Sequence, residues 1–313
     1  DAEAGDALSQ LRDRFTIDNY RMPVTEAPLM RVVYSRDAVN QRVVALLLFH
    51  HLVMDHVALE VLQHEMQAFL LGNAAHLSEP VPYRNYVAHT QAGLSEQEHE
   101  SFFREMLGAI DEPTLPYGQN LAHDGPAQEA QLTLENTLSH SVRQQARRLG
   151  VSAASLMHLA WAQVLGQLSG RDAVVFGTVL LGRLQGGEGS ERALGVFINT
   201  LPLCIELNAH SVKGAALATH ERLSQLLAHE HAQLAQVQQC SAMPAGTPLF
   251  STLLNYRHSA PVGSVSAEVQ AAWHGMQLLK AEEHSNYRLT LSVDDLGEDF
   301  RLKVLAGAGI DAQ

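Results

Sequence analysis

The stretch LLLFHHLVMDHVALEVL (Leu46–Leu62) constrains the fold more than any other part of this chain. An apolar run typical of a buried strand ends at His50 and His51, and an apolar helical pattern begins directly after Asp55. A strand followed at once by a helix predicts a layered structure in which helices pack on a sheet. The short connection also carries two imidazoles and a carboxylate, which a rigid strand end can present to a functional site.

Strand and helix patterns alternate along the rest of the chain, and the segments over 28–35 and 41–50 predict a hairpin. The other expected strands are 131–136, 172–182, 195–207, 250–258, 287–295 and 300–307. The expected helices are 57–71 with Gly72 as its stop, 95–108, one closing at Gly150, 152–170 with Ser152 as N-cap and Gly170 past its end, and 215–238. The Pro-, Gly- and Asp-rich segment 110–128 is the best candidate for a connection between lobes. The pattern therefore predicts an α/β fold, an α+β sandwich of two lobes, at residues 1–112 and 113–313.

Composition narrows the class of protein. With 46% hydrophobic and 18% charged residues, the chain fits a soluble globular protein of about two lobes. Its net charge of −13 argues against partners such as nucleic acid or anionic lipid. We find no signal peptide and no apolar run long enough for a membrane-spanning helix. Only Cys204 and Cys240 are present, which favours a reducing, cytoplasmic location.

The histidine pair by itself carries little information, because 17 histidines give about one adjacent pair by chance. Its position at a strand end raises its interest. Strand alternation puts His50 and His51 on opposite faces, so at most one of them lies in a given site. His50 alternatively is a half-buried, hydrogen-bonded histidine, and Asp55 alternatively is only the N-cap of the helix.

Other chemistries have weaker support. His and Asp are common metal ligands, but no HExxH motif or second ligand cluster accompanies the pair, so we expect no metal. The HEH segment at 229–231 lies on an expected helix and reads as a solvated face. There is no GxSxG elbow, Walker loop or GxGxxG after a strand. The glycine-rich segment 186–195 is expected to be a flexible connection, not a phosphate cradle.

An ordered series of segments resembles a known family. FHHLVMDH (49–56) is similar to an HHxxxDG core, and GRDAVVFGTVLLGR with LGVFINTLPL (170–183 and 194–203) resembles a strand and crossover motif. LLNYRHS (253–259) and HSNYRLTLSVDD (284–295) resemble two late motifs. In series, these segments resemble a nonribosomal peptide synthetase condensation domain of the chloramphenicol-acetyltransferase-like superfamily.

The resemblance implies two acetyltransferase-like lobes that form a V-shaped pseudo-dimer with a central tunnel. It implies that a donor acyl group and an acceptor aminoacyl group arrive as thioesters on the 4'-phosphopantetheine arms of carrier proteins. The implied partners are an upstream donor carrier domain, a downstream acceptor carrier domain and an adjacent adenylation domain. No bound cofactor is implied, although a starter type would use a coenzyme A thioester.

The resemblance also assigns residues. His51 matches the catalytic histidine, with His50 supporting the loop. Asp55 matches an aspartate that pairs with an arginine, here Arg183, and Asn255 matches an asparagine close to the active centre. The chemistry fits, because an amine that attacks a thioester must lose a proton and imidazole, with an unperturbed pKa of about 6.5, accepts one near neutral pH. Whether His51 is a general base or positions the amine stays open at this stage.

The chain departs from the family pattern in several places. His56 stands where the family has glycine, so the turn is either ordinary here or altered at the tunnel. His51 also comes early in the chain, and we expect that the first lobe lacks its first segment and the second its last helix. Two alternatives remain: an epimerization domain or coenzyme A-dependent acyltransferase on the same fold, and a non-catalytic docking module.

Overall fold

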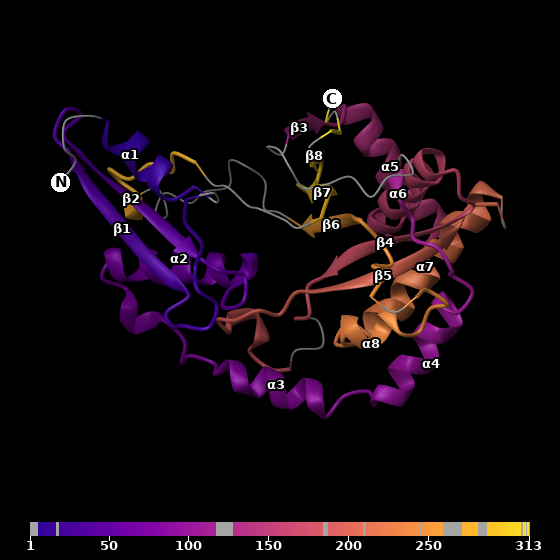
Figure 1. Cartoon of the computed structure of the whole chain (residues 1–313). Helices are drawn as coiled ribbons and strands as arrows, with labels where there is room; N and C mark the ends of the chain where they lie inside the picture. The colour runs from indigo at the N-terminus through magenta and orange to yellow at the C-terminus, as the bar shows by residue number, and fades with distance from the viewer. Residues whose placement is uncertain are drawn as a thin grey trace. The chain divides into compact units, whose positions relative to one another are not determined.

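The structure is a computed structural model of the chain (Figure 1). It describes residues 6–16, 19–116, 128–183, 187–208, 211–244, 246–258, 271–280, 287–307, 309–310 and 312. Most of the predicted connection over 110–128 lies outside the described residues. Residues 259–270 and 281–286 are likewise outside the description, so the late motifs are described only in part.

Contacts divide the chain into two compact units. Unit 1 comprises residues 1–87 and 186–197, and unit 2 comprises residues 88–185 and 198–313. Unit 1 therefore takes in a segment that the sequence inserts between two strands of unit 2. The predicted lobes, 1–112 and 113–313, stay a prediction.

Unit 1 contains the predicted hairpin, which is confirmed as an antiparallel pair. Its strands are β1 (Met30–Asp37) and β2 (Arg42–Phe49), with Met30 opposite Phe49 and Asp37 opposite Arg42. At the turn, the Asp37 carboxylate accepts hydrogen bonds from Asn40 N at 3.1 Å and Arg42 Nε at 2.8 Å. The Asp37 side chain thus stabilises the turn that joins the two strands.

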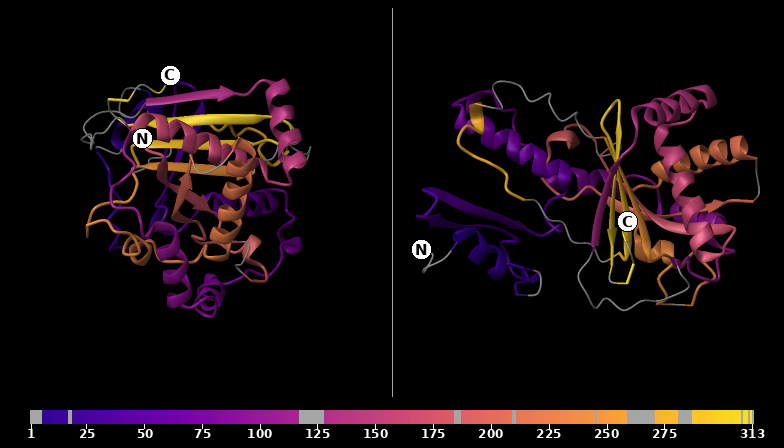
Figure 2. Two further views of the ribbon diagram at one scale, coloured as in Figure 1. Left: turned by 90° about the vertical axis from the view of Figure 1, so that its right-hand side faces the viewer. Right: turned by 90° about the horizontal axis from the view of Figure 1, so that it is seen from above.

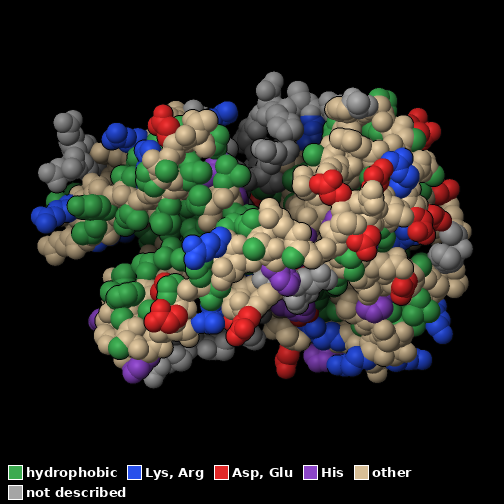
Figure 3. All heavy atoms as spheres, turned by 90° about the horizontal axis from the view of Figure 1, so that it is seen from below, with side chains coloured by type: hydrophobic (Ala, Val, Ile, Leu, Met, Phe, Trp, Pro, Cys, Tyr) green, Lys and Arg blue, Asp and Glu red, His purple; other side chains and the backbone are tan. Residues whose placement is uncertain are grey.

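The two faces of the hairpin differ. Helix α1 (Ala7–Arg14) packs on one face, where Leu11 and Val44 are buried. The other face exposes apolar side chains, among them Val32, Tyr34 and Leu47, and hydrophobic side chains gather over this half of the molecule in Figure 3. An isolated two-stranded sheet is marginally stable, so the hairpin depends on its packed face.

Helix α2 (His56–Leu70) follows the hairpin and confirms the predicted helix over 57–71. It ends before Gly72, whose φ of +73° lies in the left-handed region that glycine adopts freely. The short η1 turn (Ala74–His76) follows, and α3 (Tyr83–Gln91) begins in unit 1 and ends in unit 2. The hairpin and α2 therefore leave the His50–Asp55 connection as one short turn between two regular elements.

Unit 2 is built on a six-stranded mixed sheet in the order β3-β8-β7-β6-β4-β5. β6 is parallel to β4 and β7, and the other neighbours are antiparallel. The predicted strands are confirmed, although β3 begins earlier than expected and β5 begins only after residue 198. The strands are β3 (Gln128–Thr133), β4 (Ala173–Leu180), β5 (Asn199–Glu206), β6 (Thr252–His258), β7 (Leu289–Asp295) and β8 (Phe300–Ala306).

Helices α5 (Asn136–Leu149), α6 (Ala153–Ser169) and α7 (Val212–Ala228) cover one face of this sheet (Figure 2). The predicted caps are confirmed: the Ser152 hydroxyl accepts from Ser155 N at 3.1 Å, and Gly150 and Gly170 end their helices at φ of +69° and +68°. α4 (Glu96–Leu107) begins at a capping box formed by Ser95 and Glu98. These local signals explain why the helix ends were readable from the sequence.

The core of unit 2 lies between the sheet and its helices. β4 buries Val174, Val175 and Phe176 in succession, and β5 buries Leu201 to Ile205 almost without interruption. Continuous apolar runs of this kind are typical of strands that are covered on both faces. α6 contributes Trp161, Ala162 and Leu165 to the same core.

The predicted long helix over 215–238 is wrong. α7 ends at Ala228, and a separate short helix, α8 (Leu234–Gln238), begins after a break at residues 229–233. The prediction that residues 229–231 form a solvated face is wrong too, because Glu230 is fully buried and the His231 side chain is 13% exposed. Glu230 makes buried tertiary hydrogen bonds at this break in place of the hydrogen bonds of a continuous helix. These tertiary contacts override the helical sequence pattern over 215–238.

Within the part of the chain that the structure describes, no single helix is both long and apolar enough to cross a membrane. α5 and α6 meet the length and composition criteria only as a pair bent by 108°.

Candidate active site

The His50–Asp55 connection forms a tight turn in unit 1. β2 ends at Phe49, His50 N still donates to Leu29 O at 3.0 Å, and Val53 N donates to His50 O at 3.1 Å. His51 thus lies in the turn itself and is exposed, with its ring 6.1 Å from that of Phe49 in an edge-on arrangement. Because the strand has ended, the alternation rule that we applied to His50 and His51 does not operate here.

His50 is half-buried, and its ring supports the turn. Its Nδ1 accepts a hydrogen bond from Leu52 N at 3.1 Å. An acceptor at Nδ1 leaves the proton of a neutral imidazole on Nε2. The contact is the one expected of a half-buried, hydrogen-bonded histidine, and it holds the backbone next to His51.

Asp55 is fully buried and holds two backbone amides. Its Oδ1 accepts from Ala58 N at 2.8 Å, which confirms the N-cap of α2, and its Oδ2 accepts from Phe197 N at 2.9 Å. The Asp55 amide in turn donates to Gly195 O at 3.2 Å. The residue therefore caps the helix and also joins it to the segment that enters unit 1 between β4 and β5.

His56 is the first residue of α2. It stands where the family has glycine, and the backbone there is that of an ordinary turn. Among the described residues other than glycine, only Gln41 has a positive φ, so the turn needs no left-handed residue at position 56. His56 Nε2 lies 3.3 Å from Glu60 Oε1, with side chains 59% and 62% exposed. An exposed pair one helical turn apart adds little stability.

Residues 187–197 belong to unit 1 and pack on the rest of it, which corrects the expectation of a flexible connection over 186–195. The segment contains the short turn η3 (Ser190–Arg192), which contacts α2, and it buries Ala193 and Phe197. A Cβ added at Gly195 would collide with the ring of Tyr83. The glycine content thus serves close packing here.

Two tyrosines that our sequence reasoning missed hold this segment. The Tyr83 hydroxyl donates to Val196 O, and the Tyr86 hydroxyl donates to Phe197 O at 3.4 Å. Their rings lie 5.3 Å and 4.3 Å from the ring of Phe197. The available signal was their spacing of three residues, which places both on one side of a helix.

The remaining predicted residues belong to unit 2. Arg183 follows Gly182 directly after β4, and the Gly182 amide donates to Glu230 Oε2 at 3.1 Å. Asn255 lies in β6, half-buried, opposite Ser292 of β7. The structure therefore gathers His50, His51, Asp55 and His56 in one turn of unit 1. The expected pairing of Asp55 with Arg183 stays a prediction, because the two residues belong to different units.

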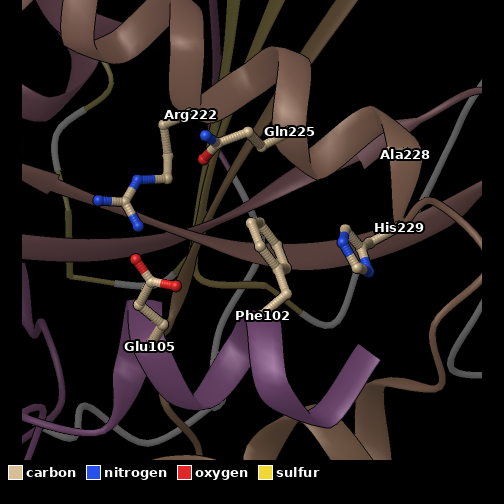
Figure 4. A pocket seen from close by; sticks show the side chains of 6 residues that line it. All are labelled: Phe102, Glu105, Arg222, Gln225, Ala228 and His229. Carbon is tan, nitrogen blue, oxygen red and sulfur yellow. The ribbon is translucent and has the colours of Figure 1, made fainter. Parts of the chain in front are cut away.

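Unit 2 also has a pocket with a volume of about 300 Å³ (Figure 4). It lies between α4 and α7, where the side chains of Glu105 and Arg222 point toward each other. The Phe102 and His229 rings, stacked at 4.1 Å, line it as well. None of the predicted site residues lines it, and we therefore place the candidate active site at the turn that carries His51.

In the part of the chain that the structure describes, no group of three or more His, Cys, Asp or Glu side chains is placed to hold a metal ion. The ionisable side chains of the candidate site are those of the histidines and the aspartate of the turn.

Comparisons with known proteins agree on one family. Residues 7–307 match the Condensation domain family. Malpibaldin synthetase of Mortierella alpina is 42% identical over 309 residues, which cover 95% of this chain and 6% of that protein. The chain thus spans only a small part of the length of such relatives.

Solved structures share the fold. Holo-AB3403, a four-domain nonribosomal peptide synthetase bound to AMP and glycine, gives a TM-score of 0.72 at 17% identity, covering 97% of this chain and 24% of that one. The starter condensation domain of rhizomide synthetase RzmA, an R148A mutant in complex with C8-CoA, gives 0.71 at 18% identity, covering 97% and 70%. At these identities the likeness shows the fold alone, and the family match over residues 7–307 carries the assignment. The chain belongs to the condensation domain family of nonribosomal peptide synthetases.

Proposed function

We propose that this chain joins two carrier-bound substrates through an amide bond, with His51 as the central residue. The donor is an acyl or peptidyl thioester, and the acceptor is the free amine of an aminoacyl thioester. Both are delivered on phosphopantetheine arms, or the donor as a coenzyme A thioester if the domain is a starter type. The partners would be the upstream and downstream carrier domains, together with an adjacent adenylation domain.

One observation carries this proposal: His51 is exposed on a turn in which side-chain hydrogen bonds hold neighbouring backbone amides. His50 holds the Leu52 amide, and Asp55 holds the amides of Ala58 and Phe197. A fixed backbone beside an accessible imidazole suits proton transfer, because the reacting geometry is set before substrate arrives.

The proposed reaction is the aminolysis of the donor thioester. The acceptor nitrogen attacks the donor carbonyl carbon, a C–N bond forms, and the C–S bond to the donor arm breaks. The amine proton passes to the imidazole of His51, and the leaving thiolate is protonated to a thiol. If His51 instead only orients the amine, the proton leaves to solvent and the bonds made and broken are the same.

The test is reconstitution of the full-length protein with an acyl-loaded donor carrier and an aminoacyl-loaded acceptor carrier. Mass spectrometry follows the amide on the acceptor arm. We expect His51→Ala to lower kcat by about 10²- to 10⁴-fold, as for loss of a general acid–base group. His51→Gln separates the two roles, because the glutamine amide can hydrogen bond to the amine but cannot take up its proton.

A matched control is His64→Ala, which removes an exposed imidazole from α2, the helix that follows the turn. It is expected to keep nearly full activity. Equal rates for wild type and a correctly folded His51→Ala protein would contradict the central role of His51. No amide from the wild type with any loaded pair of carriers would favour a docking module that does no chemistry.

A further inference from the structure

Glu230 is a fully buried carboxylate to which the proposed reaction gives no role. It lies in the break between α7 and α8, and none of its surface is exposed. A helix that continued through residue 230 would satisfy its own backbone there. The chain instead turns, and the side chain of Glu230 enters the protein. A buried charged residue requires partners, and these partners indicate what it holds.

The first partner is the exit of β4. β4 ends at Leu180, and Glu230 Oε2 accepts a hydrogen bond from the amide of Gly182 at 3.1 Å. Gly182 is buried and has a φ of +66°, so the chain bends sharply at this residue. Arg183 is the next residue, and the bend sets the direction in which its backbone continues.

The second contact, with the start of β5, is made by the main-chain carbonyl of Glu230 and not by its carboxylate. Asn199 Nδ2 donates to Glu230 O at 2.9 Å and to Ala232 O at 2.7 Å. Asn199 is the first residue of β5 and pairs with Leu180, the last residue of β4. The turn at Glu230 is thus bonded to both strand ends between which the chain leaves unit 2 and returns to it.

We propose that Glu230 is a positioning residue for the condensation reaction: by holding the Gly182 amide, it sets the direction of Arg183. This inference rests on the proposed function and on the role that the family resemblance assigns to Arg183 as the partner of Asp55 beside His51. Glu230 is not expected to touch substrate. It acts through the bend at Gly182, and its loss would displace Arg183 without removing any reacting group.

The experiment compares Glu230→Ala with Glu230→Gln in the full-length protein. Alanine removes the acceptor of the Gly182 amide, whereas glutamine keeps a carbonyl oxygen for it. We expect kcat to fall by about 10- to 100-fold in Glu230→Ala, the scale of a small misplacement of an active-site group. We expect Glu230→Gln to keep most of the activity. Hydrogen exchange at Gly182 should accelerate in the alanine variant only.

A double variant tests whether Glu230 acts through Arg183. Once Arg183→Ala has been made, adding Glu230→Ala should lower kcat little further. The matched control is Asp295→Asn, which alters another buried carboxylate of unit 2, one that binds Arg143 at 2.6 Å and Tyr256 at 2.5 Å. It is expected to lower the melting temperature while the effect of Arg183→Ala on kcat stays unchanged.

Three results would overturn the inference. These are unchanged exchange at Gly182 in Glu230→Ala, multiplying losses in the double variant, or the same kcat loss and the same coupling to Arg183 in Asp295→Asn. Failure of the proposed function looks different, because the wild-type protein then makes no amide with any loaded pair of carriers. The role of Glu230 in the reaction then falls with it, while exchange at Gly182 still decides whether Glu230 holds the bend.

Discussion

The Asp55 carboxylate accepts a hydrogen bond from the Phe197 amide at 2.9 Å, between residues 142 positions apart in the chain. Its other oxygen caps α2 through Ala58 at 2.8 Å. One buried side chain therefore closes the turn that presents His51 and also anchors the segment that arrives from between β4 and β5. A substitution of Asp55 therefore removes two structural contacts at once.

Asp55→Ala should destabilise the protein by about 2–4 kcal/mol. Loss of an N-cap costs about 1 kcal/mol, and a buried amide left without its acceptor costs about 1–3 kcal/mol. Urea unfolding measures the change. Ser95→Ala, which removes the exposed cap of α4, should cost only the first part. Equal losses in the two variants would show that the Phe197 bond contributes nothing. A low activity of Asp55→Ala is thus no proof of a chemical role.

His50→Asn should preserve the turn better than His50→Gln does. An asparagine amide oxygen lies roughly where Nδ1 of histidine lies, so it can accept the Leu52 amide that His50 now binds at 3.1 Å. The glutamine oxygen reaches further, toward the position of Nε2. Amide-forming activity and urea unfolding, measured on both variants, check this order. An inactive but fully stable His50→Asn protein would mean that His50 takes part in the chemistry.

A double-mutant cycle tests the expected pairing of Asp55 with Arg183. If the two side chains pair, the free energies of unfolding of Asp55→Ala and Arg183→Ala will not add, with an interaction energy of roughly 0.5–3 kcal/mol. The control cycle combines Asp55→Ala with Arg171→Ala. Arg171 is an arginine of unit 2 that pairs with Glu112, and the two losses should add. Additive losses in the first cycle would rule out the pairing that the family resemblance implies.

His158 should make stability depend on pH. It is buried between α6 and β4, where Nδ1 donates to Ala154 O and Nε2 accepts from Thr178 Oγ1, both at 2.7 Å. Burial lowers its pKa to about 4 from the ordinary 6.5. Between these values the unfolded chain binds a proton that the folded chain does not, so the free energy of unfolding falls as the pH falls from 6.5 to 4. The full effect is about 3 kcal/mol.

The check is urea unfolding from pH 7 down to pH 4. His158→Gln, which removes the titrating group, should show a shallower pH dependence than wild type. His64→Gln, a change on the exposed side of α2, should follow the wild-type curve. Parallel curves for wild type and His158→Gln would contradict the assignment.

Much of the fold was predictable from the sequence because it depends on neighbours in the chain. The hairpin follows from two β-branched runs around a polar turn, and α2 follows from apolar spacing between Asp55 and Gly72. Ser152, Gly150 and Gly170 mark helix ends because capping is a matter of three or four residues. The position of His51 just after β2 was predictable for the same reason, because it depends only on where the neighbouring strand ends.

What the sequence alone did not reveal depends on partners far along the chain. The sequence around Asp55 does not indicate that its second oxygen accepts a hydrogen bond from Phe197. The sequence around Glu230 likewise does not indicate that its side chain binds the Gly182 amide. The pattern over 215–238 is helical, yet burial of Glu230 stops the helix at Ala228, because a buried carboxylate and its hydrogen bonds outweigh a weak propensity. Local sequence thus determined the elements and the place of His51, while tertiary contacts decided which backbone amides the buried carboxylates hold.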